Sequence, residues 1–449
     1  MHNIEGYIFD PKRMLIYSEN VPNEIIEEFN SNYDENNKFT VPYCMSLDAR
    51  SMKMDVIAIN RAGICLTYNC NLRCKYCGYS SNEEHRQELQ IEDVKAFTKD
   101  LVVRRTIMKL LSKKDEPFIV DFTGGGEPTY NWELFVQTID YIKKICDENS
   151  IPLRLHLTTN GVLTEQQVDF ISANFDNVMV SYDGMPVTQN NNRVSPHMRT
   201  TNDIVERTIK RLSKTGIPLN IRSTVWQNDF GKMKEMCHHI FGLVENRSSV
   251  TWSIFPVLFE GRAITQVKKQ GDVSYQLFLE KYLDLIGYIR IEYGSDKLKS
   301  VDVPLFNNSI CEIFCGAYKM RQPWLMPDKT IVTCIESKDD KTVIGEIVNG
   351  SVHYYDNYED NLLRIMQDKY TECQDCIAYC ICKGGCPIWH LRVDDDIQEP
   401  LECCLLKEYW LYIIKTLITG GDSLGRKLEE INFPRAGEYK VYEIVQGEL

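Results

Sequence analysis

Strand-like and helix-like segments alternate between residues 61 and 300, and this repetition limits the possible folds more than any other feature. Each short apolar run is followed by a longer stretch in which apolar residues recur with helical spacing. The expected strands are 62–68, 118–124, 153–159, 177–182, 219–225 and 250–256, and the expected helices are 91–112, 131–147, 164–174, 202–215 and 229–243. Repeated strand–helix units predict an α/β fold with a parallel sheet and right-handed crossovers, here an open, partial (β/α)6 TIM-like barrel.

The rest of the chain divides around this barrel. Its 449 residues and 43% hydrophobic composition are enough for a buried core and more than one domain. Residues 1–60 begin with two short strands that flank an Asp-Pro-Lys-Arg turn, which predicts a hairpin that either covers a sheet edge or contacts a substrate. We expect the barrel over 61–300, an irregular cysteine-rich domain over 301–405, and a C-terminal helix with a polar tail over 406–449.

Charge and hydropathy argue against two classes of partner. The net charge is −13 and no Lys/Arg-rich stripe is present, which disfavours nucleic acid and anionic membranes. The first ten residues carry acidic side chains where a secretion signal needs an apolar core. The apolar stretch 409–418 is half the length of a membrane span and contains Lys415. We therefore expect a cytoplasmic protein.

Cysteine usage indicates metal binding. Of the 17 cysteines, three lie within 70–77 and ten between 311 and 404. A disulfide scaffold is normally short and secreted, whereas clustered cysteines in a long cytosolic chain more often hold metal. Cys65, in a predicted strand, and Cys146, at the helical spacing of apolar neighbours, are expected to be small core residues.

Three cysteines, Cys70, Cys74 and Cys77, share one tight loop after the first predicted strand. Structural zinc sites close with four ligands, and most four-iron clusters use four cysteines. A loop with three thiolates leaves one iron of a cubane open to a small molecule. The carboxyl ends of barrel strands are also where functional loops gather.

The run CNLRCKYCGYS, with Tyr76 one residue before the last cysteine, resembles the cluster loop of the radical S-adenosylmethionine (SAM) enzymes. In that family the open iron of a [4Fe–4S] cluster binds the amino and carboxylate groups of SAM. The resemblance also implies a partial barrel.

Further segments at strand ends resemble the SAM site of that family. The Gly-Gly-Glu run Gly125, Gly126 and Glu127 would bind the amino group of SAM, although a glycine-rich turn is the alternative. The third strand ends in an Asn-Gly pair and the fourth in Ser-Tyr-Asp-Gly, which are also ordinary turn sequences. Alternation along the fifth strand turns Arg222 away from the apolar face, where it suits the SAM carboxylate, although a surface salt bridge is the alternative. The SAM contacts implied by the resemblance are Tyr76, Gly125, Gly126, Glu127, Asn160, Ser181, Asp183 and Arg222.

The C-terminal cysteines resemble the SPASM domain of peptide-modifying radical SAM enzymes. The run Cys373, Cys376, Cys382 and Cys386 matches its central spacing. Upstream, a predicted hairpin ends at Cys334, and Lys329 replaces the usual glycine, which predicts a locally different turn. By the interleaved wiring of that family, one auxiliary cluster would use Cys311, Cys315, Cys334 and Cys386. The other would use Cys373, Cys376, Cys382 and Cys404 (or Cys403), which leaves Cys380 unused. A four-cysteine zinc site is the alternative.

The resemblance implies a function. Three [4Fe–4S] clusters and SAM would be the cofactors, and an external low-potential electron donor would be required. SAM would be cleaved reductively to methionine and a 5′-deoxyadenosyl radical, which removes a hydrogen from the substrate. An auxiliary cluster would accept the next electron, so that a peptide or protein is oxidised.

Three interpretations of the function remain open. The first is a maturase that installs a thioether or another cross-link in a ribosomally made peptide. The second resembles the anaerobic sulfatase-maturing enzymes, which form formylglycine; they carry an Asp directly after the hairpin cysteine, whereas Ile335 follows Cys334 here and Glu336 comes next. The third is a non-catalytic iron–sulfur carrier or a zinc-stabilised binding protein. A carrier needs a fourth cysteine near the loop, and Cys65 is poorly spaced for that role.

Overall fold

The computed structural model divides the chain into two compact units, which are described separately. Unit one comprises residues 1–53, 305–315 and 362–449, and unit two comprises 54–304 and 316–361. The structure describes residues 2–4, 6–10, 15–18, 59–79, 87–112, 117–245, 249–257, 262–263, 274–303, 322–336, 342–355, 373, 376–378, 382, 385–386, 388 and 401–418. The predicted ligands Cys311 and Cys315, the unused Cys380, and the tail 419–449 lie outside these residues.

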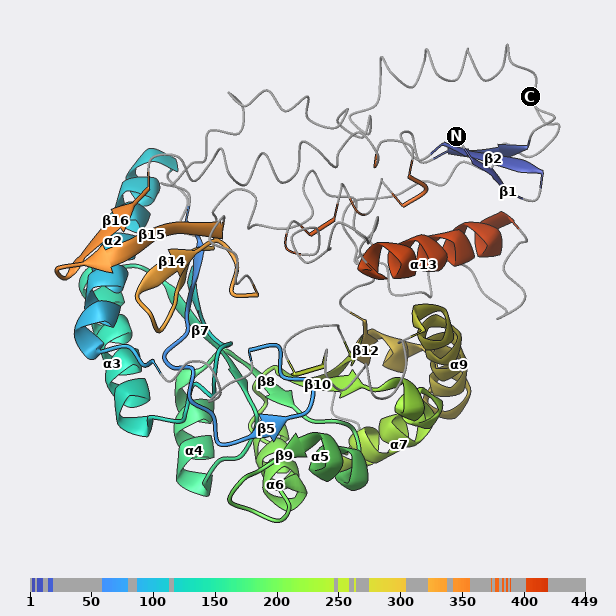
Figure 1. Ribbon diagram of the computed structural model, residues 1–449, viewed down its shortest axis with the longest axis horizontal. Coiled ribbons are helices and arrows are strands. Elements are labelled where there is room, and N and C mark those ends of the chain that lie inside the picture. The colour runs from blue at the N-terminus through green and yellow to red at the C-terminus, as the bar shows by residue number, and fades with distance from the viewer. Residues whose placement is uncertain are drawn as a thin grey trace, which may run out of the picture. The chain divides into compact units, whose positions relative to one another are not determined.

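Unit two contains the predicted barrel (Figure 1). Its parallel strands lie side by side in chain order. They are β4 (Arg61–Ile64), β6 (Phe118–Phe122), β7 (Leu153–Thr159), β8 (Asn177–Ser181), β10 (Leu219–Val225), β11 (Val250–Pro256) and β12 (Val301–Asp302). The first six are the strands predicted from the sequence, and β12 was not predicted. The α/β partial-barrel fold is therefore confirmed.

One main helix follows each strand up to β11. These helices are α2 (Ile91–Ser112), α3 (Trp132–Glu148), α4 (Glu165–Asn174), α6 (Asn202–Ser213), α7 (Met233–Leu243) and α9 (Tyr275–Tyr293). The predicted helix 229–243 is divided between a 3-10 helix (Gln227–Lys232) and α7. Local signals set the helix starts: Thr164 and Gln167 form a capping box before α4, and the Asn131 side chain accepts from the Leu134 amide before α3.

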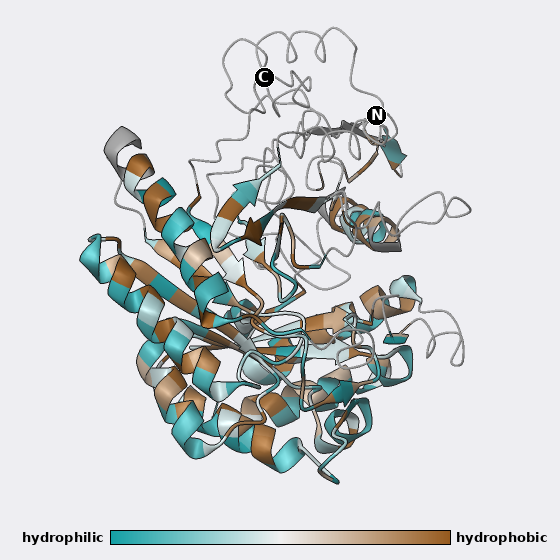
Figure 2. Cartoon of the chain, turned by 60° about the vertical axis from the view of Figure 1, so that its left-hand side comes forward, coloured by the Kyte–Doolittle hydropathy of each residue, from teal (hydrophilic) through white to brown (hydrophobic). Residues whose placement is uncertain are grey.

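The core lies between the sheet and these helices. Alternate residues of each central strand are buried against the helices, while the residues between them are partly exposed on the other face. Phe122, Phe135 and Phe175 lie with ring centroids 5.7–5.9 Å apart and are almost fully buried. Figure 2 shows hydrophobic and hydrophilic residues alternating along the covering helices. Cys146, which is fully buried on α3, is the core residue predicted from its spacing.

A short antiparallel sheet extends the barrel beyond β4. It consists of β13 (Trp324–Leu325), β14 (Thr330–Val332), β15 (Val343–Val348) and β16 (Ser351–Tyr354). The strand β13 pairs in parallel with β4, and Trp324 lies opposite Gly63. A Cβ atom on Gly63 would lie 1.8 Å from the Trp324 ring, so the absent side chain makes room for the indole. The predicted hairpin that ends at Cys334 is therefore an integral part of the barrel sheet.

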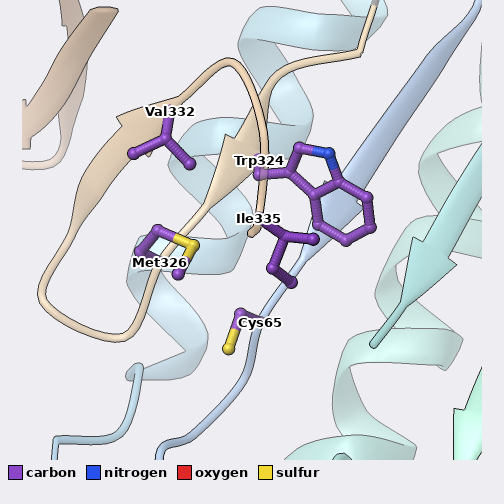
Figure 3. Close-up of a cluster of buried hydrophobic side chains, with 5 residues drawn as sticks. All are labelled: Cys65, Trp324, Met326, Val332 and Ile335. Atoms are coloured by element: carbon purple, nitrogen blue, oxygen red, sulfur yellow. The ribbon is translucent and has the colours of Figure 1, made fainter. Parts of the chain in front are cut away.

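A hydrophobic cluster joins this hairpin to the first barrel strand (Figure 3). It contains Cys65, Trp324, Met326, Val332 and Ile335. Burial raises the pKa of the Cys65 thiol to about 12, so the thiol is neutral and packs as a small apolar group. Cys65 is thus a core residue, as the sequence predicted.

The hairpin turn keeps a glycine-like backbone even though Lys329 occupies the position. Lys329 has a φ of 72°, in the left-handed region. Its ammonium lies 3.0 Å from the Asp93 carboxylate in the first turn of α2, and its amide donates to the Met326 carbonyl. Lys329 thus adopts the conformation that glycine prefers, with these two contacts beside it, and whether the turn differs from that of the family stays a prediction.

An ion-pair cluster ties the first strands together. The Arg61 guanidinium donates two hydrogen bonds to the Asp121 carboxylate, and His156 Nδ1 lies 3.4 Å from it. Gln322, just before β13, also donates to Asp121 at 3.2 Å. Burial alone would raise the pKa of Asp121, but Arg61 and His156 outweigh burial and hold it below its usual value.

Asp121→Asn is expected to destabilise the barrel by about 1–2 kcal/mol at pH 7, because Arg61 is partly exposed and the pair is partly screened. Since the folded-state pKa is depressed, this stabilisation is present above the unfolded-state pKa of about 3.9 and is lost as pH falls through the folded value. Urea denaturation from pH 7 to 3 checks the prediction. The difference between wild type and variant should shrink below about pH 4, and a constant difference would contradict it.

The helix and strands of unit one come from the beginning and the end of the chain. The strands β2 (Tyr7–Asp10) and β3 (Leu15–Ser18) form the predicted hairpin, and β1 (His2–Ile4) adds a third antiparallel strand. The predicted C-terminal helix is α13 (Leu401–Ile418). Within the described residues, none of the helices combines the length and apolar character that crossing a membrane requires.

Candidate radical SAM site

The three-cysteine loop is held against the Gly-Gly-Glu turn after β6 by backbone contacts. The Gly126 amide donates to the Thr67 carbonyl at 2.8 Å, and the Glu127 amide donates to the Asn69 carbonyl at 2.9 Å. A Cβ atom on Gly126 would lie 1.8 Å from the Asn69 oxygen. Gly125 has a φ of 65°, and a Cβ atom on it would lie 2.4 Å from the Cys65 sulfur. The two predicted glycines therefore allow the chain that leads into the loop to cross directly over the turn.

The three thiols act on one another electrostatically. Burial raises the pKa of Cys70, and the charges of Cys74 and Cys77 raise it further. Burial raises the pKa of Cys74 to about 11, while Arg193 and Arg262 oppose this rise. The Leu72 amide donates to the Cys70 sulfur at 3.4 Å. Three thiols on one loop, with nearby cations and an amide donor that oppose the effect of burial, are the kind of ligands that an iron–sulfur cluster uses.

A four-iron cluster separates its ligands more widely than a single ion does. In the described part of the chain, no three His, Cys, Asp or Glu side chains converge closely enough to hold one metal ion.

A buried ion pair anchors the second half of the loop. Asp183, 1% exposed, accepts from the Tyr76 hydroxyl at 2.6 and 2.7 Å and from Arg193 Nε at 2.9 Å. The Arg193 guanidinium also lies over the Tyr76 ring, 5.3 Å from its centroid. A two-stranded sheet brings these groups together, since β5 (Arg73–Cys74) pairs with β9 (Arg193–Val194). The predicted SAM contacts Tyr76 and Asp183 thus bind each other in this structure.

The Glu127 carboxylate also binds groups of the protein itself. Its carboxylate is 2% exposed and accepts from the Thr159 hydroxyl at 2.7 Å, the Thr129 hydroxyl at 2.8 Å and the Asn160 amide at 2.8 Å. Burial raises the pKa of Glu127, and these donors oppose the rise. Asn160 in turn places its side-chain amide 3.8 Å from the Cys70 sulfur. The turn after β6, the end of β7 and the cysteine loop are therefore one hydrogen-bonded assembly.

Ser181 and Arg222 lie opposite each other on β8 and β10. The Arg222 guanidinium stacks on the Phe255 ring, with a distance of 4.0 Å to the centroid. It makes no ion pair with a carboxylate among the described residues, and burial lowers its pKa, partly offset by the charge of Glu336. A desolvated guanidinium that lacks a carboxylate partner suits a bound carboxylate.

The auxiliary cysteines are divided between the two units. Cys334 follows β14 in unit two, and Cys373, Cys376, Cys382 and Cys386 belong to unit one. On α13, Cys403 is partly buried and Cys404 is exposed. The proposed interleaved wiring therefore stays a prediction.

The segment after Cys334 contacts the three-cysteine loop directly. Tyr79, two residues after Cys77, donates its hydroxyl to the Ile335 carbonyl. A Cβ atom on Gly124, before the Gly-Gly-Glu run, would lie 2.1 Å from the Ile335 side chain. The hairpin end is thus packed against both the loop and the turn that supports it.

Several residues of the site were not predicted from the sequence. Arg193 and Tyr79 fix the loop, and Thr129 and Thr159 hold the Glu127 carboxylate. Arg193 follows three asparagines in a segment without acidic residues, and this pattern is only a weak indication of its role in the site. Their roles depend on long-range pairing that a sequence pattern does not contain.

Comparisons with known proteins agree with this geometry. Residues 64–238 match the sequence profile of the Radical SAM superfamily. The cysteine-type anaerobic sulfatase-maturating enzyme of Clostridium perfringens (strain 13 / Type A) is 23% identical over 376 residues, covering 79% of this chain and 96% of that enzyme.

Two solved structures share the fold. Native anSMEcpe with bound AdoMet and a peptide has a TM-score of 0.57 at 20% identity and covers 81% of this chain and 99% of its own. Streptococcus suis SuiB bound to precursor peptide SuiA has a TM-score of 0.53 at 14% identity and covers 86% of this chain and 82% of its own.

The fold and the three-cysteine loop thus agree with the class of iron–sulfur enzymes that use SAM. The segment 64–238, which contains the loop with Cys70, Cys74 and Cys77, matches the Radical SAM superfamily.

Proposed function

We propose that this enzyme is a radical SAM maturase that oxidises a side chain of a ribosomally made peptide and forms a thioether or another cross-link. One observation carries the proposal: the strands that precede the three-cysteine loop and Cys334, β4 and β14, belong to one sheet, and the segments after them contact each other through Tyr79 and Ile335. This contact would hold the proposed SAM site close to a predicted auxiliary-cluster ligand. When bound, a four-iron cluster and SAM supply a radical that removes hydrogen from an unactivated carbon.

The protein residues would bind and position these groups. We propose that Cys70, Cys74 and Cys77 hold the cluster, and that Asn160, Ser181 and Arg222 contact SAM. Arg222 would bind its carboxylate through the planar guanidinium. Glu127 and Asp183 would act mainly by fixing the loop, because their oxygens already accept hydrogen bonds within the protein.

A peptide is the proposed substrate because similar proteins process peptides or proteins. SuiB was solved with a precursor peptide, and the curated relative is named for sulfatase maturation. We further propose two auxiliary [4Fe–4S] clusters in the cysteine-rich region, with the ligand sets given above, and an external low-potential electron donor. The auxiliary clusters would accept the electron that the oxidised substrate gives up.

Formylglycine formation is the second candidate, since the curated relatives are sulfatase-maturating enzymes. The residue after Cys334 distinguishes formylglycine formation from cross-linking. Ile335 is buried in the hydrophobic cluster, where an ionised acid would lose its hydration, and the next residue, Glu336, is exposed. The absence of an acid at position 335 favours the cross-linking reaction.

The test uses anaerobically reconstituted enzyme, SAM, a strong reductant, and two sets of peptides. One set consists of cysteine-rich precursor peptides encoded beside the gene, and the other contains a sulfatase-type cysteine motif. We expect 5′-deoxyadenosine and a precursor product that has lost two hydrogens, detected by mass spectrometry. An aldehyde product that reacts with a hydrazide would instead establish the second candidate.

The Cys70/Cys74/Cys77 triple alanine variant is the control. It should lose about four of roughly twelve irons per chain, which is one cluster's worth, and all 5′-deoxyadenosine formation. Tightly bound zinc with almost no iron in the wild-type protein would overturn the proposal and support a zinc-stabilised binding protein.

A further inference from the structure

The three-cysteine loop includes the strand β5, which pairs with β9 in a two-stranded sheet. Cys74 lies in β5, opposite Arg193 in β9, and the Lys75 amide donates to the Asn192 carbonyl at 2.9 Å. The short helix α5 (Pro186–Asn192) leads directly into β9 (Figure 1). Residues 70–79 and 184–200 are therefore joined through this small sheet, and the surface that their exposed residues form includes the strand of a predicted cluster ligand.

This surface lacks acidic residues in a strongly acidic protein. The chain has 64 Asp and Glu residues and a net charge of −13, yet neither 70–79 nor 184–200 contains one. The carboxylate that acts on Cys74 is that of Asp183, which is buried and paired with Arg193. No Asp or Glu within these two segments therefore offsets their Lys and Arg side chains.

The cations of this surface are available to a partner. The Lys75 ammonium donates to the Asn191 side chain at 2.8 Å, and Arg73 donates to the carbonyls of Cys70 and Leu72. Arg199 is exposed. Within the described ranges, none of these three cations pairs with a carboxylate. Since no described carboxylate pairs with them, their charge can attract an acidic surface.

Exposed apolar side chains lie within the same surface. Val187 on α5 is 74% exposed, and Val194 on β9 is 40% exposed. Both belong to segments whose other residues are largely buried or bonded, so they are not disordered ends. Val194 lies opposite Arg73 in the β5–β9 pair, so an exposed apolar side chain and a cation share one face of this sheet. Apolar and cationic groups together have the composition of a transient protein-binding site with electrostatic attraction.

We propose that this surface, which we name the β5–β9 face, docks an acidic ferredoxin-type one-electron carrier. The inference rests on the proposed function, because it assigns the donor that this function requires. Each encounter oxidises the reduced iron–sulfur centre of the carrier by one electron and reduces the cluster held by the loop by one electron; no atom is transferred. Plant-type ferredoxins have low reduction potentials, which suits a low-potential acceptor. Cys74 lies within the docked strand itself, so the electron has a short route.

Lys75→Glu tests the docking site with a charge reversal. The control is Lys210→Glu in the last turn of α6, because that turn leads to the start of β10, at the end of the barrel opposite the loop. The holoenzyme is mixed anaerobically with a reduced acidic ferredoxin, and oxidation of the ferredoxin is followed by stopped flow. Binding of labelled, oxidised ferredoxin is measured in parallel by fluorescence anisotropy.

In Lys75→Glu we expect the second-order rate constant at low salt to fall about tenfold and to depend less on ionic strength. Binding should weaken in parallel, while Lys210→Glu behaves as wild type. Reduction by dithionite, which needs no docking, should continue in every variant that binds a normal amount of iron. Val194→Glu and Arg199→Glu provide the same test if Lys75→Glu binds too little iron.

The outcomes separate this inference from the proposed function. If wild-type enzyme cleaves SAM with dithionite but all face variants bind and oxidise ferredoxin normally, the docking site is wrong and the function stands. If an acidic flavin carrier, but not ferredoxin, requires Lys75, the assigned class of carrier is wrong. If dithionite supports no SAM cleavage in wild type, the function itself fails.

Discussion

Gly126→Ala is expected to abolish assembly of the three-cysteine cluster while leaving the barrel folded. The new Cβ atom would lie 1.8 Å from the Asn69 carbonyl oxygen and 2.7 Å from the Tyr68 carbonyl carbon. Both are backbone atoms, so no side-chain rotation relieves the clash. The chain leading to Cys70 must move, and the Gly126 and Glu127 amides would lose their bonds to it. Iron content should fall by about one cluster, and SAM cleavage should fall more than about 100-fold.

Gly242→Ala is the matched control for this substitution. Gly242 lies within α7, and a Cβ atom there meets nothing within 4 Å, so this alanine should be neutral or slightly stabilising. Iron analysis and electron paramagnetic resonance of both reconstituted variants provide the measurement, with circular dichroism to verify folding. Normal cluster assembly in Gly126→Ala would show that the loop does not depend on this close approach.

The barrel was predictable because its signals are local. Buried strands such as 219–225 show alternating or continuous apolar runs, and the helix 91–112 begins and ends where the sequence predicts. The six predicted strands also occupy the sheet in chain order, as right-handed crossovers require. The three-cysteine loop was predictable for another reason: its ligands share one short segment, so their proximity needs no tertiary information.

Long-range pairing was not predictable in the same way. The contact of β13 with β4 joins residues more than 250 positions apart, and only the structure shows that Gly63 makes room for Trp324. Arg193 joins the site because β9 pairs with β5. The Lys329 turn shows another limit, since the sequence gives neither its left-handed φ nor its ion pair with Asp93.

The predicted SAM residues illustrate a limit of motif-based prediction. Glu127 and Asp183 were singled out as polar groups at strand ends, and the structure does place them beside the three-cysteine loop. Their oxygens, however, are occupied by Thr159, Asn160, Tyr76 and Arg193. A motif indicates that a carboxylate is needed there. It does not distinguish a group that touches the ligand from one that holds the loop in place.

Asp183→Ala is expected to cost about 3–5 kcal/mol of folding free energy, because it leaves Arg193 buried and unpaired. Asp183 and Arg193 are 1% and 7% exposed, so water does not replace the lost partner. Tyr76 would also lose its acceptor, and β5 would separate from β9. The reconstituted variant should therefore lack the cluster at the three-cysteine loop.

Tyr76→Phe is the conservative comparison, since it removes one hydroxyl and keeps the Asp183–Arg193 pair and the ring beneath the guanidinium. It should cost only about 1 kcal/mol and retain most of the iron. Urea denaturation of the apo-proteins measures the two free energies separately from cluster binding. If Asp183→Ala were as stable as Tyr76→Phe, Arg193 would have to find another partner or water. The loop would then be held mainly by its contacts with the Gly-Gly-Glu turn.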